Sequence, residues 1–219
     1  MKSAASLVVC DEVGVVVQLR DHGLPARDVI LDALKIGYAE RASCTSNDPA
    51  TFPGLMGWGR TLRALRESLT PSGWTRGTLD GLEVVLHPER KVAISVSLGD
   101  ADTGDPDGHP QTKHPKGSAA EAAVAANQLR LPLIERTKPV SARPAARIDG
   151  FVVWYLLYAP TDEEIQCELS QPSSISNSGH FTDWRVRILP GPIAVRPKPV
   201  APTDMTPPID FDVPRRGKQ

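Results

Sequence analysis

Closely spaced arginines are the first residues of this 219-residue sequence whose type and spacing could do chemistry. Arg60, Arg63 and Arg66 recur every third residue, so on a helix they follow one side. Guanidinium groups in such a row can bind the phosphates of a nucleic acid or the carboxylates of an acidic protein surface. The candidate binding residues are these arginines and the basic residues that follow them: Arg60, Arg63, Arg66, Arg76, Arg90 and Lys91.

The surroundings of these arginines leave two interpretations open. Two helices followed by a hairpin are the outline of a winged helix, in which a helix enters the major groove and the hairpin contacts phosphate. However, the predicted loop between the helices has about nine residues, whereas a helix-turn-helix uses three or four. Residues 53–98 carry six basic and four acidic groups, a local charge of +2. The alternative is a solvated helix face whose arginines pair with Glu67 and its neighbours.

The polar loop 99–117 is a second candidate, because it holds aspartates, histidines and lysines. An EF-hand that began at Asp100 would need Gly at position 6 and Glu at position 12, where this sequence has Asp105 and Gln111. We therefore predict no metal site and no cofactor.

An anion site at the end of this loop is a better hypothesis. A helix is predicted to follow, and the free N–H groups and dipole at a helix start attract phosphate. The pattern of a P-loop is absent. The residues of this hypothesis are Asp100, Lys113, Lys116, Gly117 and Ser118.

The C-terminal stretch 191–219 is the third candidate. It holds seven of the 21 prolines, which favour an extended chain over helix or sheet. Apolar and acidic residues alternate from Ile209 to Val213, a pattern that suits strand addition to the edge of a partner's sheet. The predicted docking residues of this arm are Ile209, Phe211, Val213, Arg215 and Arg216.

The elements that must position these residues follow from hydrophobic patterning. We expect strands over 7–10 and 15–19, and then a helix after Pro25 with Ile30, Leu34 and Tyr38 on one face. A second helix has a repeat of large apolar residues at steps of three and four, which we expect to form one buried stripe: Leu55, Trp58, Leu62, Leu65 and Leu69.

The remaining expected elements are a hairpin of strands 82–86 and 92–98, an Ala-rich helix over 118–129, and strands over 151–158, 164–169 and 184–189. The last two strands alternate apolar and polar residues, which predicts one buried and one solvated face. On the solvated face, Glu168 would pair with Arg185 or Arg187 at about 0.2–1 kcal/mol.

These elements predict an α+β fold with a helical N-terminal half that contains a β-hairpin, a C-terminal antiparallel sheet and a Pro-rich tail. We expect the helices, the hairpin and the polar loop in residues 1–130, followed by a connector in 131–148. Strands that pack on the same body follow in 149–190, and an arm follows in 191–219.

Composition excludes some function classes. The formal net charge is −1, which argues against a globally basic nucleic-acid coat. The apolar stretch near the N-terminus is short and soon interrupted by Asp11 and Glu12, so we expect no secretory signal, no membrane partner and a cytoplasmic protein.

Several motifs carry a resemblance to known sequences: residues 57–67 (GWGRTLRALRE), 73–76, 93–94, 99–104 (GDADTG), 115–117, 168–172 and 184–188 (WRVRI). On these motifs the chain resembles a group of uncharacterised bacterial proteins carried on plasmids, integrative elements and phages. The resemblance covers roughly residues 54–190. It implies a setting on mobile DNA and brings no activity, catalytic residue or cofactor.

Together these features favour binding over catalysis. We expect a non-enzymatic accessory or inhibitor protein of a mobile genetic element, whose partner is a protein or nucleoprotein complex such as a host defence system. The alternative is a nucleotide- or phosphate-binding enzyme or sensor that uses the 99–118 loop. The sequence does not specify an oligomeric state.

Overall fold

A computed structural model describes residues 6–79, 81–117, 120, 121, 124, 125, 127 and 150–195 of the chain. The fold is α+β, as predicted. The connector 131–148 and the arm beyond Val195 lie outside the described residues. The labelled helices are α1 (Glu12–Asp21), α2 (Arg27–Ala42), α3 (Phe52–Leu69) and a short 3-10 helix, η1 (Thr70–Ser72). The described residues 120, 121, 124, 125 and 127 are helical as well.

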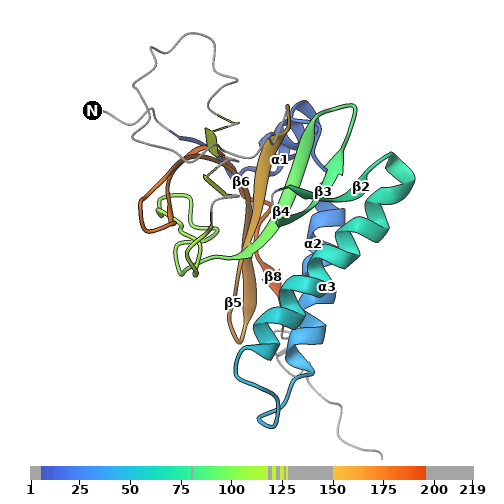
Figure 1. Cartoon of the computed structure of the whole chain (residues 1–219), viewed down its shortest axis with the longest axis vertical. Coiled ribbons are helices and arrows are strands. Elements are labelled where there is room, and N and C mark those ends of the chain that lie inside the picture. Colours follow the sequence, from blue (N-terminus) through green and yellow to red (C-terminus); the bar gives the residue numbers. More distant parts are fainter. Residues whose placement is uncertain are drawn as a thin grey trace, which may run out of the picture.

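All the labelled strands of the described residues belong to one twisted sheet (Figure 1). Its spatial order is β1-β7-β6-β5-β4-β3-β2, and β8 pairs with β6 beside this row. Its strands are β1 (Leu7–Val9), β2 (Thr75–Leu79), β3 (Leu82–His87), β4 (Val92–Leu98), β5 (Val152–Pro160), β6 (Glu164–Ile175), β7 (Phe181–Ile188) and β8 (Ile193–Ala194).

The sheet differs from the expected one in its extent and in two of its pairings. The predicted hairpin is confirmed as the antiparallel pair β3–β4, and β5, β6 and β7 are antiparallel neighbours. However, β4 pairs in parallel with β5, and β1 in parallel with β7. β2 was missed in the sequence, because Thr75-Arg76-Gly77-Thr78 has little apolar alternation.

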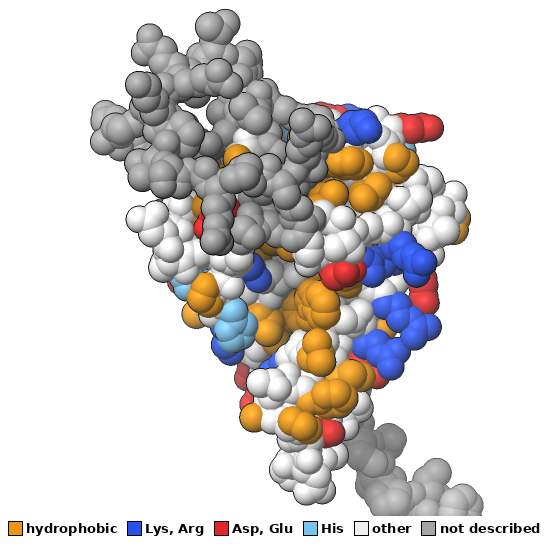
Figure 2. All heavy atoms as spheres, viewed as in Figure 1, with side chains coloured by type: hydrophobic (Ala, Val, Ile, Leu, Met, Phe, Trp, Pro, Cys, Tyr) orange, Lys and Arg blue, Asp and Glu red, His pale blue; other side chains and the backbone are white. Residues whose placement is uncertain are grey.

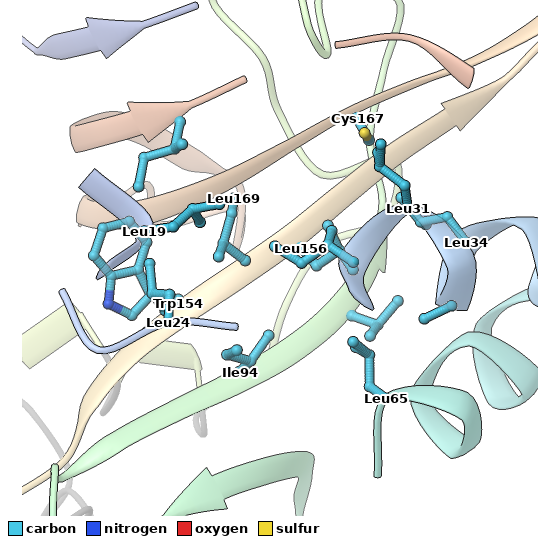
Figure 3. Close-up of a cluster of buried hydrophobic side chains, with 14 of the residues drawn as sticks. Leu19, Leu24, Leu31, Leu34, Leu65, Ile94, Trp154, Leu156, Cys167 and Leu169 are labelled. Atoms are coloured by element: carbon cyan, nitrogen blue, oxygen red, sulfur yellow. The ribbon is translucent and has the colours of Figure 1, made fainter. Parts of the chain in front are cut away.

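The main hydrophobic core lies between one face of the sheet and α1, α2 and α3. Figure 3 shows Leu31, Leu34 and Leu65 of the helices in one cluster with Ile94 and Leu156 of the central strands. The spacing of three and four residues in α2 and α3 makes this packing possible, because it places these side chains along one side of each helix. The prediction of both helices is confirmed.

The opposite face of the sheet is covered as well. The loop 99–117 and the helical residues around Ala120 and Val124 lie over it, and a second core forms there around Tyr155, Leu157 and Phe181. In β6, Glu168 and Ser170 are fully buried on this side. The predicted solvated face of β6 is therefore wrong, since polar alternation cannot tell whether a loop will cover the polar side.

Residues 15–19 form part of α1, so the predicted strand over 15–19 is wrong. The side chain of Asp11 caps the helix by accepting a hydrogen bond from the Gly14 amide, at 2.7 Å. Val15 and Leu19, four residues apart, are buried on the same side of the helix. Capping and packing thus outweigh the β preference of the valine run.

A β-bulge also changes the predicted pattern of β7. Val186 lies opposite Gln171 and Trp184 opposite Pro172, so β7 has one additional residue, Arg185, between these two pairs. Trp184 consequently belongs to the second core, whereas Val186 belongs to the core under the helices. The prediction that these two side chains share one face is wrong for this reason.

Two glycines let α2 and α3 approach each other closely. A Cβ at Gly37 would lie 1.9 Å from Thr61 Oγ1 and 2.7 Å from the Gly57 carbonyl oxygen. Gly57 itself faces Arg41 and the Tyr158 hydroxyl. By contrast, a Cβ at Gly59 would meet nothing within 4 Å among the described residues.

We predict opposite effects on stability for alanine at two of these glycines. Gly37→Ala should lower the free energy of unfolding by about 1–3 kcal/mol, because the helices must separate to admit the methyl group. Gly59→Ala should raise it by about 0.5–1 kcal/mol, because alanine restricts the unfolded chain and favours helix. Urea denaturation measures both, and equal effects at the two positions would contradict the close approach of α2 and α3.

Candidate functional site

The exposed side of α3 changes from apolar at its start to basic further along. We call the residues Phe52, Leu55, Gly59, Arg60 and Arg63 the α3 face. Leu55 is 56% exposed and Phe52 36%, so the prediction that Leu55 belongs to the buried stripe is wrong. Figure 2 shows the Lys and Arg side chains gathered on the right, over α3, with hydrophobic side chains toward the lower end of the molecule, where α3 begins.

The two arginines of the α3 face form ion pairs that are open to solvent. Arg63 Nε lies 2.8 Å from Glu67 Oε1, one helical turn away, and Arg60 Nε lies 3.8 Å from Glu40 Oε2 on α2. The side chain of Arg63 is 61% exposed. Pairs of this kind contribute little in water and exchange readily, so both guanidinium groups stay available to a partner.

Arg66 has a different environment, although the sequence groups it with Arg60 and Arg63. Its guanidinium donates to the carbonyl oxygens of Val84 and Gly77 and to the Glu83 carboxylate, at 2.7–3.2 Å. The ion pair with Arg66 holds the pKa of Glu83 below its ordinary value. Arg66 therefore fastens α3 to β2 and β3, and its contacts are used within the fold.

The other predicted basic residues are spread over different elements. Arg76 is exposed on β2. Arg90 donates to the Gly23 carbonyl oxygen at 3.3 Å, and the Lys91 ammonium lies 5.1 Å from the centre of the Phe151 ring. The structure thus brings Arg60 and Arg63 together on α3 and places Arg90 beside the end of α1.

The aspartates of the 99–117 loop serve the loop itself. The Asp100 carboxylate accepts hydrogen bonds from the backbone amides of Asp102 and Gln111, and Asp102 accepts one from the His109 amide. Within the described residues, no group of three or more His, Cys, Asp or Glu side chains could hold a metal ion.

Beneath this loop lies a buried ion pair between Glu168 of β6 and Arg187 of β7. The guanidinium Nε and Nη2 atoms donate to the two Glu168 oxygens at 3.1 and 2.5 Å. The remaining contacts satisfy both groups: Ser170 and the Gly104 amide donate to Glu168, and Arg187 donates to the carbonyl oxygens of Asp105 and Gly108.

This pair confirms the expected pairing of Glu168 with an arginine of β7 and corrects the expected setting. Glu168 was expected on a solvated strand face, yet its side chain is 0% exposed and that of Arg187 is 3% exposed. Its partner is Arg187, whereas Arg185 is exposed at the bulge. Because Glu168 and Arg187 use most of their hydrogen-bonding groups within the fold, the pair attaches the loop to the sheet.

The described residues of the anion hypothesis have different environments. Lys113 is exposed, and Lys116 Nζ points to β4, where it donates to Ser97 Oγ at 2.6 Å. Burial lowers the pKa of Lys116 below its ordinary value. Gly117 is exposed, and Ser118 lies outside the described residues. The arm residues Ile209, Phe211, Val213, Arg215 and Arg216 also lie outside them.

A cavity of about 870 Å³ beside α1 and the start of α2 has no counterpart in the sequence analysis. Arg27, Arg90, Asp28 and His22 are among its lining residues. Burial, and then the charge of Arg185, lower the pKa of His22. No sequence motif marks this cavity, because its residues come from a turn, a helix start and a distant hairpin.

No protein-family model matches the chain, and no curated protein or solved structure is significantly similar to it. Among the described residues, no helix has both the length and the apolar character needed to cross a membrane. The geometry above is therefore the basis for a functional proposal.

Replacing one residue of the Glu168–Arg187 pair should strongly lower the free energy of unfolding. Arg187→Met leaves a buried carboxylate without its counter-charge, and we expect a loss of about 3–5 kcal/mol in the free energy of unfolding. The double variant Glu168→Leu/Arg187→Met should lose less than the sum of the single variants. Chemical denaturation measures the cycle, and Arg63→Ala, from an exposed pair, is the control that should leave the midpoint nearly unchanged.

Burial of Lys116 should make the free energy of unfolding depend on pH. Because the pKa of Lys116 is lowered in the folded state, the unfolded chain binds this proton more tightly. This group therefore makes the free energy of unfolding of the wild type increase as pH rises toward 10.5. Lys116→Met removes that gain. The stability difference, variant minus wild type, should therefore fall between pH 7 and the ordinary lysine pKa of 10.5, as measured by thermal unfolding. A difference that is constant with pH would contradict burial of the ammonium.

Proposed function

We propose that this protein is a non-enzymatic binding protein that docks through the α3 face on a protein or nucleoprotein complex. The observation that carries this proposal is the combination, on one rigid helix, of exposed apolar side chains with two arginines whose ion pairs are open to solvent. Protein interfaces are enriched in this mixture, with aromatic residues and arginine at the positions that contribute most to affinity.

The rigidity of α3 supports the proposal. Its buried side is fixed by the close approach to α2 and its end is fixed by Arg66 on β2 and β3. A partner therefore binds a surface that is already ordered, and little conformational entropy is lost in docking. Arg60 and Arg63 would steer an acidic partner toward this surface and fix its orientation.

The biological setting comes from the resemblance to proteins of mobile genetic elements. A binding protein without chemistry of its own, carried on mobile DNA, fits an accessory or inhibitor role against a host complex such as a defence system. Such complexes handle nucleic acid, whose phosphates offer the same anionic chemistry as an acidic protein surface. The nucleotide-binding alternative has less support, because Asp100 and Lys116 already make contacts within the fold.

The proposal predicts that charge reversal on the α3 face abolishes partner capture. The test variant is Arg60→Glu/Arg63→Glu, which removes both exposed guanidinium groups and leaves Arg66 in place to hold the fold. The matched control is Arg20→Glu/Lys35→Glu, which makes the same change in charge at two exposed ion pairs on α1 and α2. Both variants should keep a wild-type thermal midpoint.

The measurement is affinity capture from bacterial lysate with and without nuclease, followed by identification of the bound proteins. Wild type and the control should retain the same partner after nuclease, and the α3 variant should retain less than about a tenth of it, a change of about 1.4 kcal/mol or more in binding. Undiminished capture by the α3 variant would overturn the proposal. Loss of every partner on nuclease treatment would assign the α3 face to nucleic acid.

A further inference from the structure

β2 (Thr75–Leu79) is the last strand at its end of the sheet, and no strand of the described residues pairs with its outer side. Along that side, every second residue presents its backbone N–H and C=O groups without a strand partner. Proteins usually cover or pair such an edge, because it can accept a further strand. The backbone groups and side chains of β2 therefore determine which segment could bind at this edge.

The two sides of β2 have different chemistry. Gly77 lies opposite Val84, a residue of the second core, so Leu79 is on that side of the sheet as well. Arg76 alternates with these residues and lies on the side of the helices. It is exposed, and it forms no ion pair within the described residues.

An added strand would need apolar side chains on one side and acidic side chains on the other. The apolar ones would extend a row of half-buried leucines at the margin of the second core: Leu79, Leu82 and Leu86. The acidic ones would lie beside Arg76. A five-residue segment would match the length of β2.

We propose that residues 209–213 of the same chain add to the outer edge of β2 as this strand. Their sequence is Ile-Asp-Phe-Asp-Val, so one side carries Ile209, Phe211 and Val213 and the other carries Asp210 and Asp212. The alternation matches the two sides of β2 in both polarity and charge. The backbone groups of β2 supply the hydrogen bonds, as in other cases of strand addition.

The length of the chain permits this contact within one molecule. β8 lies beside β6, and a strand beyond β2 would be six strand spacings away in the order β8-β6-β5-β4-β3-β2, about 29 Å at 4.8 Å each. Ile209 lies fourteen residue steps after Val195, and a fully extended chain of that length spans about 46–50 Å. The arm thus reaches the edge with length to spare.

The experiment is amide hydrogen exchange on the full-length chain, resolved by residue in NMR. Phe211→Pro removes one N–H and breaks the segment as a strand, and Val200→Pro places the same change in the arm outside the segment. The outward-facing amides of β2 should exchange at least about tenfold faster in Phe211→Pro than in wild type, which corresponds to about 1.4 kcal/mol of protection. Val200→Pro should match wild type.

A second measurement tests the charge match. Arg76→Asp should lose the protection of β2, and Asp210→Arg/Asp212→Arg in the same chain should restore it. Light scattering during size exclusion should report a monomer in which the protection is independent of concentration.

Two results would overturn the inference. One is equal exchange of the β2 amides in wild type and Phe211→Pro. The other is protection that appears only in a dimer, which would assign the segment to a second copy of the chain.

Discussion

The ion pair between Glu168 and Arg187 is the contact on which the rest of the structure depends. Two opposite charges leave water together, and this is tolerable only because donors and acceptors surround both of them. Three of these groups belong to the loop 99–117: the Gly104 amide and the carbonyl oxygens of Asp105 and Gly108. The pair consequently fixes where the loop lies on the sheet and makes β6 a strand with two buried faces.

Burial of both faces of the sheet determines which side of α3 stays exposed. With both faces of the central strands buried, the helices pack on one side and the loop on the other, so one core contains Leu65 and the second contains Phe181. Within that arrangement α3 is fixed on three sides: by the core, by the glycine contacts with α2, and by Arg66 on the β2–β3 hairpin. The side that remains is the α3 face.

Much of the fold was predictable from local patterns, and the failures have identifiable physical causes. The repeat of Leu62, Leu65 and Leu69 predicts α3 because packing and helical period agree there. The valines of α1 prefer strands locally, but the Asp11 cap and the burial of Val15 and Leu19 decide in favour of helix. Burial of Glu168 was not predictable, because its covering loop is about sixty residues away in the sequence.

The candidate site was predictable only in part for the same reason. Arg63 is exposed and Arg60 half-buried on the same helix side, as their spacing indicates. Arg66 has the same spacing, yet β2 and β3 reach it from outside the helix, and nothing local signals those carbonyl groups. The apolar start of the α3 face was hidden because Leu55 satisfies the period of the buried stripe while lying at its margin.

The pairing of β1 with β7 has a consequence for how the chain is made. Leu7 leaves the ribosome well before its strand neighbour Val186, which comes 179 residues later in the sequence. The strands that α1 and α2 cover in the core, β4 to β7, also come later than these helices. Contacts between such distant parts of a sequence form slowly. The nascent helices therefore expose their apolar sides until β4 to β7 have left the ribosome, a period in which a chaperone would protect them from aggregation.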